Sequence, residues 1–395
     1  MNKESVHRSC TECYGAHVAR GSVRRKDNGW SYRVDLGPDP ATGKRRQVAK
    51  QGFRTRKAAE ASLGEVMRAA ATGSVVSRSA TTVEEFLNDW LSSQRHRLRP
   101  TSLHSYKMAI DRISRRLGKV PVQALTPLQI EKFYAELLGS GGRGGKPLSA
   151  KTVRNSHVVL RKALSDAERL GLVHRNAAAA AKPPTFSRPE FATWSSEDLR
   201  EFFTAIRDER IFAPLVVLAT TGMRRGEVLG LRWPDVDLDA GQLAIVQTLT
   251  AVDGVPTIGA TKTSRSRRTV YIDPQTVTVL REHRKRQREE RLIAGPAWTA
   301  TPDLVFRDEA GMLIHPDRFS REFSRVVASS GLTPIRLHDL RHTYATLALK
   351  AGVHPKVVSE RLGHATVGIT LDLYSHVTPA IARDAANVVA DRIFE

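Results

Sequence analysis

The stretch TPIRLHDLRHTYATLALKAGVHPKVVSERLGHATVGITLDLY, residues Thr333–Tyr374, carries His338, Arg341, His364 and Tyr374 in one short segment. His338 and Arg341 are three positions apart in a run with helical apolar spacing, so their side chains should leave the same face of a helix. His364 follows a glycine that would end the next helix, and Tyr374 comes ten positions later. Each residue alone has an ordinary structural explanation. Whether they act together depends on what the rest of the chain supplies.

The composition indicates a polyanionic partner. The 395 residues include 62 Lys and Arg against 41 Asp and Glu, a formal net charge of +21. The basic residues are spread along the whole chain, and arginine, which suits bidentate phosphate and guanine contacts, greatly outnumbers lysine. A surplus of this size favours nucleic acid, with counterion release supplying much of the affinity. The alternative is a generically basic protein from an arginine-rich proteome.

The N-terminus and the cysteine content favour a reducing, intracellular compartment. Cys10 and Cys13 are the two cysteines, too few for a disulfide framework. No apolar run approaches the roughly 20 residues that span a bilayer, and the polar start has no signal-peptide core. We therefore expect a cytoplasmic protein with no membrane association. Zinc-ligand spacing occurs at His7, Cys10, Cys13 and His17. Because residues 1–20 lack a second ligand pair, we expect a disordered leader there and assign no metal.

Residues 21–73 are expected to form a small domain of β-sheet plus helix. Trp30–Leu36 alternates like a strand, a turn-rich segment follows, and Lys44–Lys50 can return as a second strand. Thr55 then caps a helix to about Ala71. A short sheet with basic side chains on one face can enter a DNA major groove; the alternative is a solvated strand face. The side chains expected to contact DNA are Arg24, Arg33 and Arg45.

Residues 81–175 read as a basic module of four helices. Thr82 begins a capping box, Thr126 precedes a proline at the first position of a helix, and Ser149 caps the fourth helix. The alanine- and proline-rich segment 176–190 is expected to be a linker between domains. Three exposed basic residues of this module are the expected DNA contacts: Lys107, Lys151 and Arg154.

Residues 191–395 mix helices with strands. Ile211–Thr221 is apolar all round and predicts a buried helix, whereas Leu243–Leu249 and Arg268–Ile272 alternate like strands of a small antiparallel sheet. Pro274–Arg291 reads as a long charged helix. The predicted fold is therefore multidomain and mainly α, with an α+β C-terminal domain that holds one small sheet.

A second informative stretch, Thr220–Trp233, lies upstream. The buried helix should break at Gly222, and Arg224 then lies near the N-terminus of a new helix, where its fork of donors suits an oxyanion or phosphate. Glu227, three positions on, can hold that arginine in place. An isolated pair of this kind is more often a helix salt bridge. Lys262 lies at a turn before the strand that begins near Arg268.

Together these residues form a set able to attack a phosphodiester without a metal. Two arginines can hold the non-bridging oxygens and neutralise charge in the transition state. Lysine or histidine can move protons on the attacking and leaving oxygens, and tyrosine can supply the nucleophile. The set comprises Arg224, Lys262, His338, Arg341, His364 and Tyr374.

The C-terminal half resembles the tyrosine recombinases, specifically the phage-type integrases. Five motifs stand in the order and approximate spacing of that family, and the resemblance extends over the chain from about residue 20. Residues 81–175 are similar to the family's core-binding domain and residues 21–73 to its arm-binding domain. The motifs are Thr221–Glu227, Thr261–Thr263, Leu337–Thr343, Leu362–His364 and Thr370–His376.

The resemblance implies a role for each matching residue. Arg224 and Arg341 would hold the phosphate, with Glu227 supporting the first of them. Lys262 would protonate the leaving 5′-oxygen, and Tyr374 would form a 3′-phosphotyrosyl bond. His338 and His364 would assist proton transfer and hold the phosphate. No metal or nucleotide cofactor would be needed, because the ester bond is conserved in the phosphotyrosine. Arg225, His342 and His376 would be structural or contact the DNA backbone.

The family implies further partners and leaves alternatives. The substrate would be double-stranded DNA attachment sites in the nucleoid, bound by a tetramer with an accessory DNA-bending or directionality factor. Residues 379–395 have helical apolar spacing and would dock on a neighbouring subunit or close the chain's own core. A topoisomerase of type IB and a non-catalytic DNA-binding regulator are alternatives. A metal-dependent nuclease would need Asp235, Asp237 and Asp239 as ligands, but we interpret them as a helix-to-strand connection, because Ala240 stands where a calcium loop needs glycine.

Overall fold

A computed structural model describes residues 20–26, 29–38, 45–71, 79–186, 192–261, 267–299, 301–364, 366–368, 370–371, 390 and 393–394. The chain divides into two compact units, one of residues 1–98 and 105–186 and the other of residues 99–104 and 187–395. Within the described residues, no helix is long and apolar enough to cross a membrane. Several residues singled out in the sequence lie outside the described part: His7, Cys10, Cys13, His17, Lys262, Tyr374 and His376.

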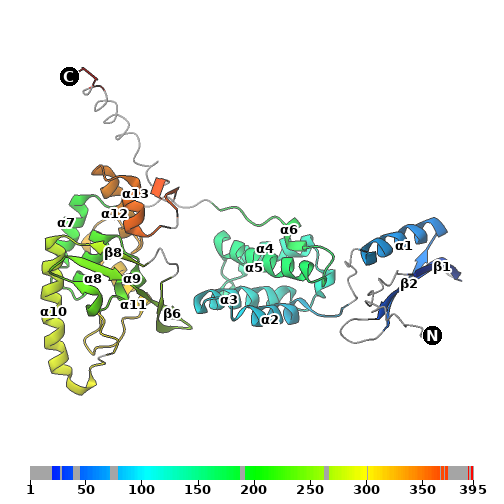
Figure 1. Ribbon diagram of the computed structural model, residues 1–395, viewed down its shortest axis with the longest axis horizontal. Helices are drawn as coiled ribbons and strands as arrows, with labels where there is room; N and C mark the ends of the chain where they lie inside the picture. The colour runs from blue at the N-terminus through cyan, green and yellow to red at the C-terminus, as the bar shows by residue number, and fades with distance from the viewer. Residues whose placement is uncertain are drawn as a thin grey trace, which may run out of the picture. The chain divides into compact units, whose positions relative to one another are not determined.

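The first unit begins with a three-stranded antiparallel sheet in the order β1-β2-β3 (Figure 1). Thr55 caps the helix that follows, since its hydroxyl accepts a hydrogen bond from the backbone N–H of Ala58. Tyr32, Val34 and Ala59 are buried between sheet and helix. The sequence predicted two strands and this helix; β1 adds a third. The elements are β1 (Arg20–Lys26), β2 (Gly29–Pro38), β3 (Arg45–Phe53) and α1 (Arg56–Ala71).

A helical module follows, in the same unit apart from residues 99–104. Thr82 and Thr126 each form a complete capping box, and the Ser149 hydroxyl accepts from the backbone N–H of Thr152, as their sequence positions predicted. Four long helices pack around one apolar core that includes Leu87, Ile110 and other fully buried side chains. They are α2 (Val83–Gln94), α3 (Pro100–Leu117), α4 (Pro127–Ser140) and α5 (Ala150–Arg169).

The segment expected to be a linker at 176–190 starts later than the sequence suggested. Asn176 caps a short helix, α6 (Ala177–Ala180), with its side-chain oxygen, and its side-chain amide donates to the Arg161 carbonyl on α5. Ala177, Ala178 and Ala181 are buried in the core of the helical module. Alanine has the highest helix propensity and leaves room for close helix contact. Residues 176–181 therefore belong to the helical module.

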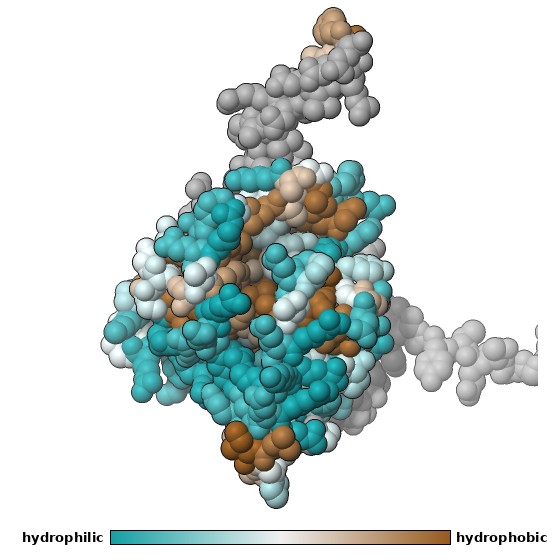
Figure 2. All heavy atoms as spheres, turned by 90° about the vertical axis from the view of Figure 1, so that its left-hand side faces the viewer, coloured by the Kyte–Doolittle hydropathy of each residue, from teal (hydrophilic) through white to brown (hydrophobic). Residues whose placement is uncertain are grey.

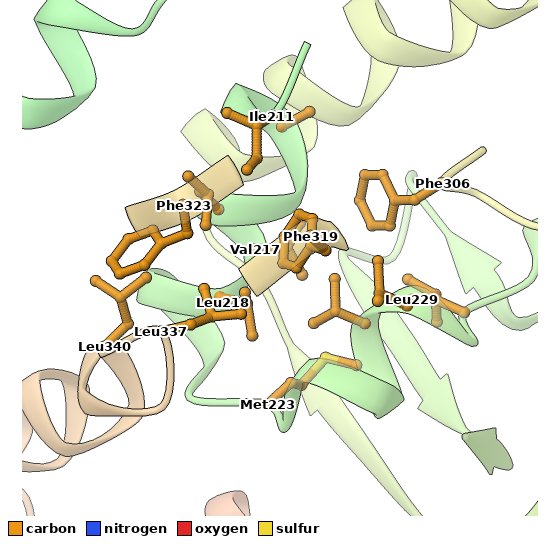
Figure 3. Packing of buried hydrophobic residues seen from close by; sticks show 14 of the residues in the cluster. Ile211, Val217, Leu218, Met223, Leu229, Phe306, Phe319, Phe323, Leu337 and Leu340 are labelled. Carbon is orange, nitrogen blue, oxygen red and sulfur yellow. The ribbon is translucent and has the colours of Figure 1, made fainter. Parts of the chain in front are cut away.

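The C-terminal unit is built around α8 (Phe212–Thr221), whose side chains are almost all buried. Figure 3 shows side chains of the helices around α8 converging on one apolar core, with Met223 and Leu340 among them. These two fully buried residues directly precede Arg224 and Arg341 in the chain. The other helices are α7 (Ser196–Ala205), α9 (Arg225–Leu229), α10 (Pro274–Ala294), α11 (Pro316–Ser330), α12 (Asp339–Lys350) and α13 (Pro355–Leu362).

The strands of this unit form two small antiparallel sheets where the sequence predicted one. The predicted strand at Leu243–Leu249 is interrupted at Val246, and its two halves belong to different sheets. One sheet has the order β4-β5-β8, and the other is a hairpin of β6 and β7 that turns at Asp253 and Gly254, both with positive φ. The strands are β4 (Val236–Asp237), β5 (Gln242–Ile245), β6 (Gln247–Val252), β7 (Val255–Ala260) and β8 (Arg268–Tyr271).

The surface of this unit is mostly hydrophilic on the face shown in Figure 2, with separate hydrophobic patches. Leu292 and Ile293, near the end of α10, are highly exposed. Single exposed apolar residues of this kind are common on protein surfaces.

Candidate active site

Arg224 is positioned by a sharp chain reversal at the end of α8. Gly222 ends the helix with φ 64°, and a Cβ atom there would come within 2.4 Å of Leu362 and 2.6 Å of Tyr344. Only glycine fits such a left-handed, crowded position without strain. Arg224 then stands at the N-cap of α9. Its guanidinium donates to Glu227 at 2.8 Å and to the Gly363 carbonyl at 2.9 Å.

Glu227 is a buried carboxylate that holds two arginines. Its side chain is 4% exposed and forms ion pairs with Arg224 at 2.8 Å and with Arg268 at 2.9 Å. It also accepts from the Arg224 backbone N–H. Burial alone would raise its pKa, but the hydrogen bonds and charges of Arg268 and Arg224 outweigh burial and hold the pKa below its usual value. Glu227 is therefore ionised and fixes both guanidinium groups.

Arg341 is a buried cation on the first turn of α12. It is 4% exposed, and it donates to the Gly222 carbonyl at 2.6 Å and to the Leu362 carbonyl at 2.8 Å. Burial, followed by repulsion from Arg224, lowers its pKa to about 9. Its hydrogen bonds among the described residues go to neutral carbonyls, and the charges of Arg224 and Arg268 repel it while that of Glu227 attracts it. A buried guanidinium of this kind is stabilised when an anion binds beside it.

The C-terminal end of α13 joins these elements. Three consecutive carbonyls accept hydrogen bonds from three arginines: Arg361 from Arg268 at 2.7 Å, Leu362 from Arg341 and Gly363 from Arg224. The last carbonyls of a helix lack intrahelical partners and carry its negative dipole, which favours cations there. The helix ends at Gly363 with φ 67°, where a Cβ atom would come within 2.8 Å of the Arg268 guanidinium.

His364 directly follows this helix end. Its backbone N–H donates to the Ser359 carbonyl, and its Nδ1 lies 2.8 Å from the Thr370 hydroxyl. Burial, followed by the nearby Arg341 and Arg224, lowers its pKa to about 4. The ring is therefore neutral at neutral pH, and an anion bound between these groups would raise its pKa.

His338 stands at the N-cap of α12, one turn before Arg341. Its ring packs edge-on against His342 with 5.1 Å between the ring centroids. Burial, followed by the charges of His342 and Arg341, lowers its pKa to about 4. Together with Arg341 it lines a cavity of about 450 Å³. The described part of the predicted set therefore lies together: Arg224, His338, Arg341 and His364, with Glu227 behind Arg224.

Arg268 is a residue of this cluster that the sequence reasoning missed. It is the first residue of β8, and its side chain is 9% exposed. The signal was present in the alternation of the strand, because Arg268 shares its face with the buried Val270. A basic residue at an inward-facing strand position implies a buried acidic partner. Arg225, by contrast, points to α11 and donates to the Pro316 carbonyl and the Ser320 hydroxyl.

The expected DNA contacts are exposed on the first unit. In the strand register Arg33 lies opposite Ser22 and Ala49. Its neighbours Tyr32 and Val34 face α1, and side chains alternate along a strand, so Arg33 projects from the uncovered face of the sheet. Arg24, paired with Ser31, has the same orientation. Arg45 forms an ion pair with Asp35 at 3.1 Å. On the helical module the exposed residues are Lys107, Lys151 and Arg154.

The three aspartates at 235–239 have structural partners. Asp235 pairs with Arg232, and Asp239 with Arg281. The Asp237 carboxylate accepts from the backbone N–H groups of Asp239 and Ala240, a turn between β4 and β5. Asp235 ends a short 3-10 helix, Asp237 ends β4, and Asp239 lies in the turn to β5, so the segment joins a short helix to a strand and that strand to the next. No group of three or more metal-ligating side chains is found within the residues that the structure describes.

Three family profiles match the chain. One described as "Phage integrase family" matches residues 195–380, and one described as "Phage integrase, N-terminal SAM-like domain" matches residues 82–138. A third, "Arm DNA-binding domain", matches residues 22–68. The three matches follow one another along the chain and cover both units.

Two relatives match over most of their length. The chain is 28% identical to a "Tyrosine recombinase XerC-like" of Caldanaerobacter subterraneus subsp. tengcongensis, over 86% of this chain and 90% of the relative. It is 29% identical to the "ICEBs1 integrase" of Bacillus subtilis, over 94% of this chain and 99% of the relative.

Solved structures share the fold. The integrase of transposon Tn1549, in complex with transposon right end DNA, superposes with a TM-score of 0.66 at 19% identity, over 78% of this chain and 99% of that one. A lambda integrase dimer bound to a core site gives a TM-score of 0.54 at 19% identity, over 89% of this chain and 93% of that one. The predicted multidomain, mainly α fold is confirmed. The chain belongs to the phage integrase family of tyrosine recombinases, enzymes that break and rejoin DNA strands.

Proposed function

We propose that this protein recombines DNA at specific attachment sites through a covalent 3′-phosphotyrosyl intermediate at Tyr374, and so integrates or excises a mobile element. The observation that carries the assignment is the pair Arg224 and Arg341, held by adjacent carbonyls of Gly363 and Leu362 at the end of α13. Both guanidinium groups are fixed by backbone atoms before any substrate binds. In the sequence, Tyr374 comes ten positions after His364, the residue that follows this helix end.

The two arginines would bind the scissile phosphate. Among the described residues, the guanidinium groups of Arg224, Arg268 and Arg341 surround the carboxylate of Glu227. This cluster therefore has a net positive charge in a partly desolvated place, where a phosphodiester is attracted strongly. The 40% exposure of the Arg224 side chain leaves it accessible to a ligand, and Arg341 borders the cavity beside α12.

The chemical steps would conserve the ester bond. The Tyr374 hydroxyl attacks phosphorus, a bond from tyrosine to phosphorus forms, and the bond to the 5′-oxygen breaks. Lys262 gives a proton to that leaving oxygen. His338 and His364 hold the phosphate and take part in removing the tyrosine proton. A 5′-hydroxyl from another strand then attacks the phosphotyrosine and releases the enzyme, so the reaction needs no metal and no nucleotide.

A cleavage assay tests this function. The substrate is a nicked duplex that carries an attachment site, taken from the direct repeats that flank the inserted element. In excess chelator the wild-type protein should leave a covalent protein–DNA adduct on a denaturing gel. Tyr374→Phe should bind the same DNA and leave no adduct. An adduct in that variant would contradict the nucleophile assignment, and a strict magnesium requirement would favour a nuclease.

The assembly and the domain roles belong to the same proposal. Residues 21–73 would bind arm-type sites, residues 81–175 would bind the core site, residues 191–395 would carry out the cleavage, and four subunits would act together. Lambda integrase has been solved as a tetramer bound to a Holliday junction. Residues 379–395 would link neighbouring subunits, and an accessory DNA-bending or directionality factor would select integration or excision in the nucleoid. Relaxation of DNA without exchange between two sites would instead indicate a topoisomerase.

A further inference from the structure

Arg268 is a nearly buried cation to which the mechanism above assigns no role. It begins β8, and its guanidinium forms a 2.9 Å ion pair with Glu227 Oε2 and a second hydrogen bond of 3.3 Å with Oε1. Its Nε also donates a 2.7 Å hydrogen bond to the Arg361 carbonyl. All three contacts use the fixed fork of the guanidinium, which a lysine cannot reproduce.

The contact with Glu227 connects Arg268 to the phosphate-binding arginine. Glu227 lies between Arg268 and Arg224 and is paired with both. Of the two arginines, Arg268 is the more buried, with 9% exposure against 40% for Arg224. Arg268 therefore supplies the permanent counter-charge of the buried carboxylate, and this leaves the more exposed Arg224 able to share its charge with a ligand.

The contact with Arg361 connects Arg268 to the end of α13. Strand and helix exchange hydrogen bonds here, because Arg268 of β8 donates to the Arg361 carbonyl and Arg361 donates to the Tyr271 carbonyl of β8 at 2.6 Å. The carbonyl that Arg268 holds immediately precedes those that hold Arg341 and Arg224. A shift of this helix end would therefore move both acceptors and the following His364.

We propose that Arg268 is a positioning residue for DNA cleavage: it holds the Glu227 carboxylate and the last turn of α13, and thereby sets Arg224 and His364 against the scissile phosphate. This inference rests on the proposed function, since it assumes that Arg224 binds that phosphate. Arg268 itself does not touch the DNA. It acts through Glu227 and through the main chain of residues 361–363.

The test compares cleavage with DNA binding in Arg268→Gln. With the nicked substrate at saturating concentration, the rate of adduct formation should fall about 100-fold, the loss expected when a reacting group is displaced by about 1 Å. The dissociation constant for the same DNA should stay within about threefold, because the other basic residues still supply the counterion release. Arg268→Lys keeps the charge but not the planar fork of the guanidinium, so its rate of adduct formation should lie between those of the wild type and Arg268→Gln.

Two control variants separate positioning from simple stability. Arg232→Gln removes a two-point ion pair with Asp235 in the same unit without touching Glu227 or α13, and it should cleave at close to the wild-type rate. Arg210→Gln breaks a partly buried pair with Glu290 far from these contacts, and it should lower the melting temperature without slowing cleavage. If both controls slow cleavage as much as Arg268→Gln does, the role of Arg268 is only structural and the inference is wrong.

A double-mutant cycle tests the route through Glu227. Because Arg268 acts largely by holding that carboxylate, Arg268→Gln should slow cleavage much less in a Glu227→Gln background than in the wild type. Fully additive losses would contradict this route, as would wild-type rates in Arg268→Gln. The wild-type adduct and its absence in Tyr374→Phe test the proposed function separately, so an intact adduct with no effect at Arg268 overturns only this inference.

Discussion

Arg341 in α12 donates a 2.6 Å hydrogen bond to the carbonyl of Gly222, which ends α8 119 positions earlier in the chain. The acceptor belongs to a left-handed glycine where an added Cβ atom would collide with Leu362 and Tyr344. The second nitrogen of the same guanidinium donates to the Leu362 carbonyl. Backbone atoms from two distant segments therefore define the plane of the guanidinium before any ligand arrives.

Replacing Arg341 with lysine should abolish most cleavage while leaving DNA binding nearly intact. A lysine carries the charge, but its three donors radiate from one nitrogen and cannot reproduce the planar fork that reaches both carbonyls and a phosphate. Loss of one fixed donor to a transition-state oxyanion slows a reaction by about 100- to 1,000-fold. The rate is measured as adduct formation on a nicked substrate at saturating DNA. Arg225→Lys is the matched control and should retain most activity, because Arg225 contacts α11.

Gly222→Ala should be strongly destabilising, and Gly331→Ala only mildly so. Both glycines end helices of the same unit with positive φ, 64° and 75°. At Gly331 nothing lies within 4 Å of the added methyl group, so its cost is the left-handed backbone alone, about 1–2 kcal/mol. At Gly222 the methyl group also meets Leu362 and Tyr344. Urea denaturation measures both, and equal losses would contradict the crowding at Gly222.

Glu227→Gln should lower the free energy of unfolding by about 3–5 kcal/mol, since it leaves the buried Arg268 without its counter-charge. Chemical denaturation measures the loss. Glu197→Gln removes an exposed pair with Arg200 in the same unit and should give no measurable change. A similar result for both variants would show that the Glu227 pair is not structurally important.

Stability should fall as the pH is lowered from about 6.5 to about 4. His283, His338 and His364 have pKa values near 4 in the folded protein, mainly because of burial. Unfolded, the same rings take up protons at about pH 6.5. Between these values the unfolded state binds more protons, so acidification favours unfolding. Denaturation at several pH values measures the slope, and His338→Gln/His364→Gln should reduce it; an unchanged slope would contradict the depressed pKa values.

Local signals in the sequence predicted much of the fold. Thr82, Thr126 and Ser149 cap helices at the expected positions because capping depends on only a few neighbouring residues. The buried helix at Ile211–Thr221 was equally clear from its uninterrupted apolar run. Gly222 ends that helix, as its position after the apolar run predicts.

Features that depend on distant partners were not predictable in the same way. β1 has little apolar alternation and owes its place to pairing with β2. The alanine-rich sequence at 177–181 is typical of a linker, and only its packing against α4 and α5 shows that it belongs to the helical core. The break at Val246 cannot be read from the alternation, because both sides of it are strands. Arg268 was overlooked because its partners, Glu227 and the Arg361 carbonyl, lie 41 and 93 positions away.

The end of α13 makes the cluster sensitive to chain length more than to side-chain identity. Its three arginine contacts use main-chain oxygens of residues 361–363, which exist whatever side chains stand at 361 and 362. Related chains can therefore vary there without losing the contacts. One residue inserted into or deleted from α13, however, would rotate the helix end by about 100° and move all three acceptors at once. Selection on this helix should thus preserve its length and the glycine that ends it.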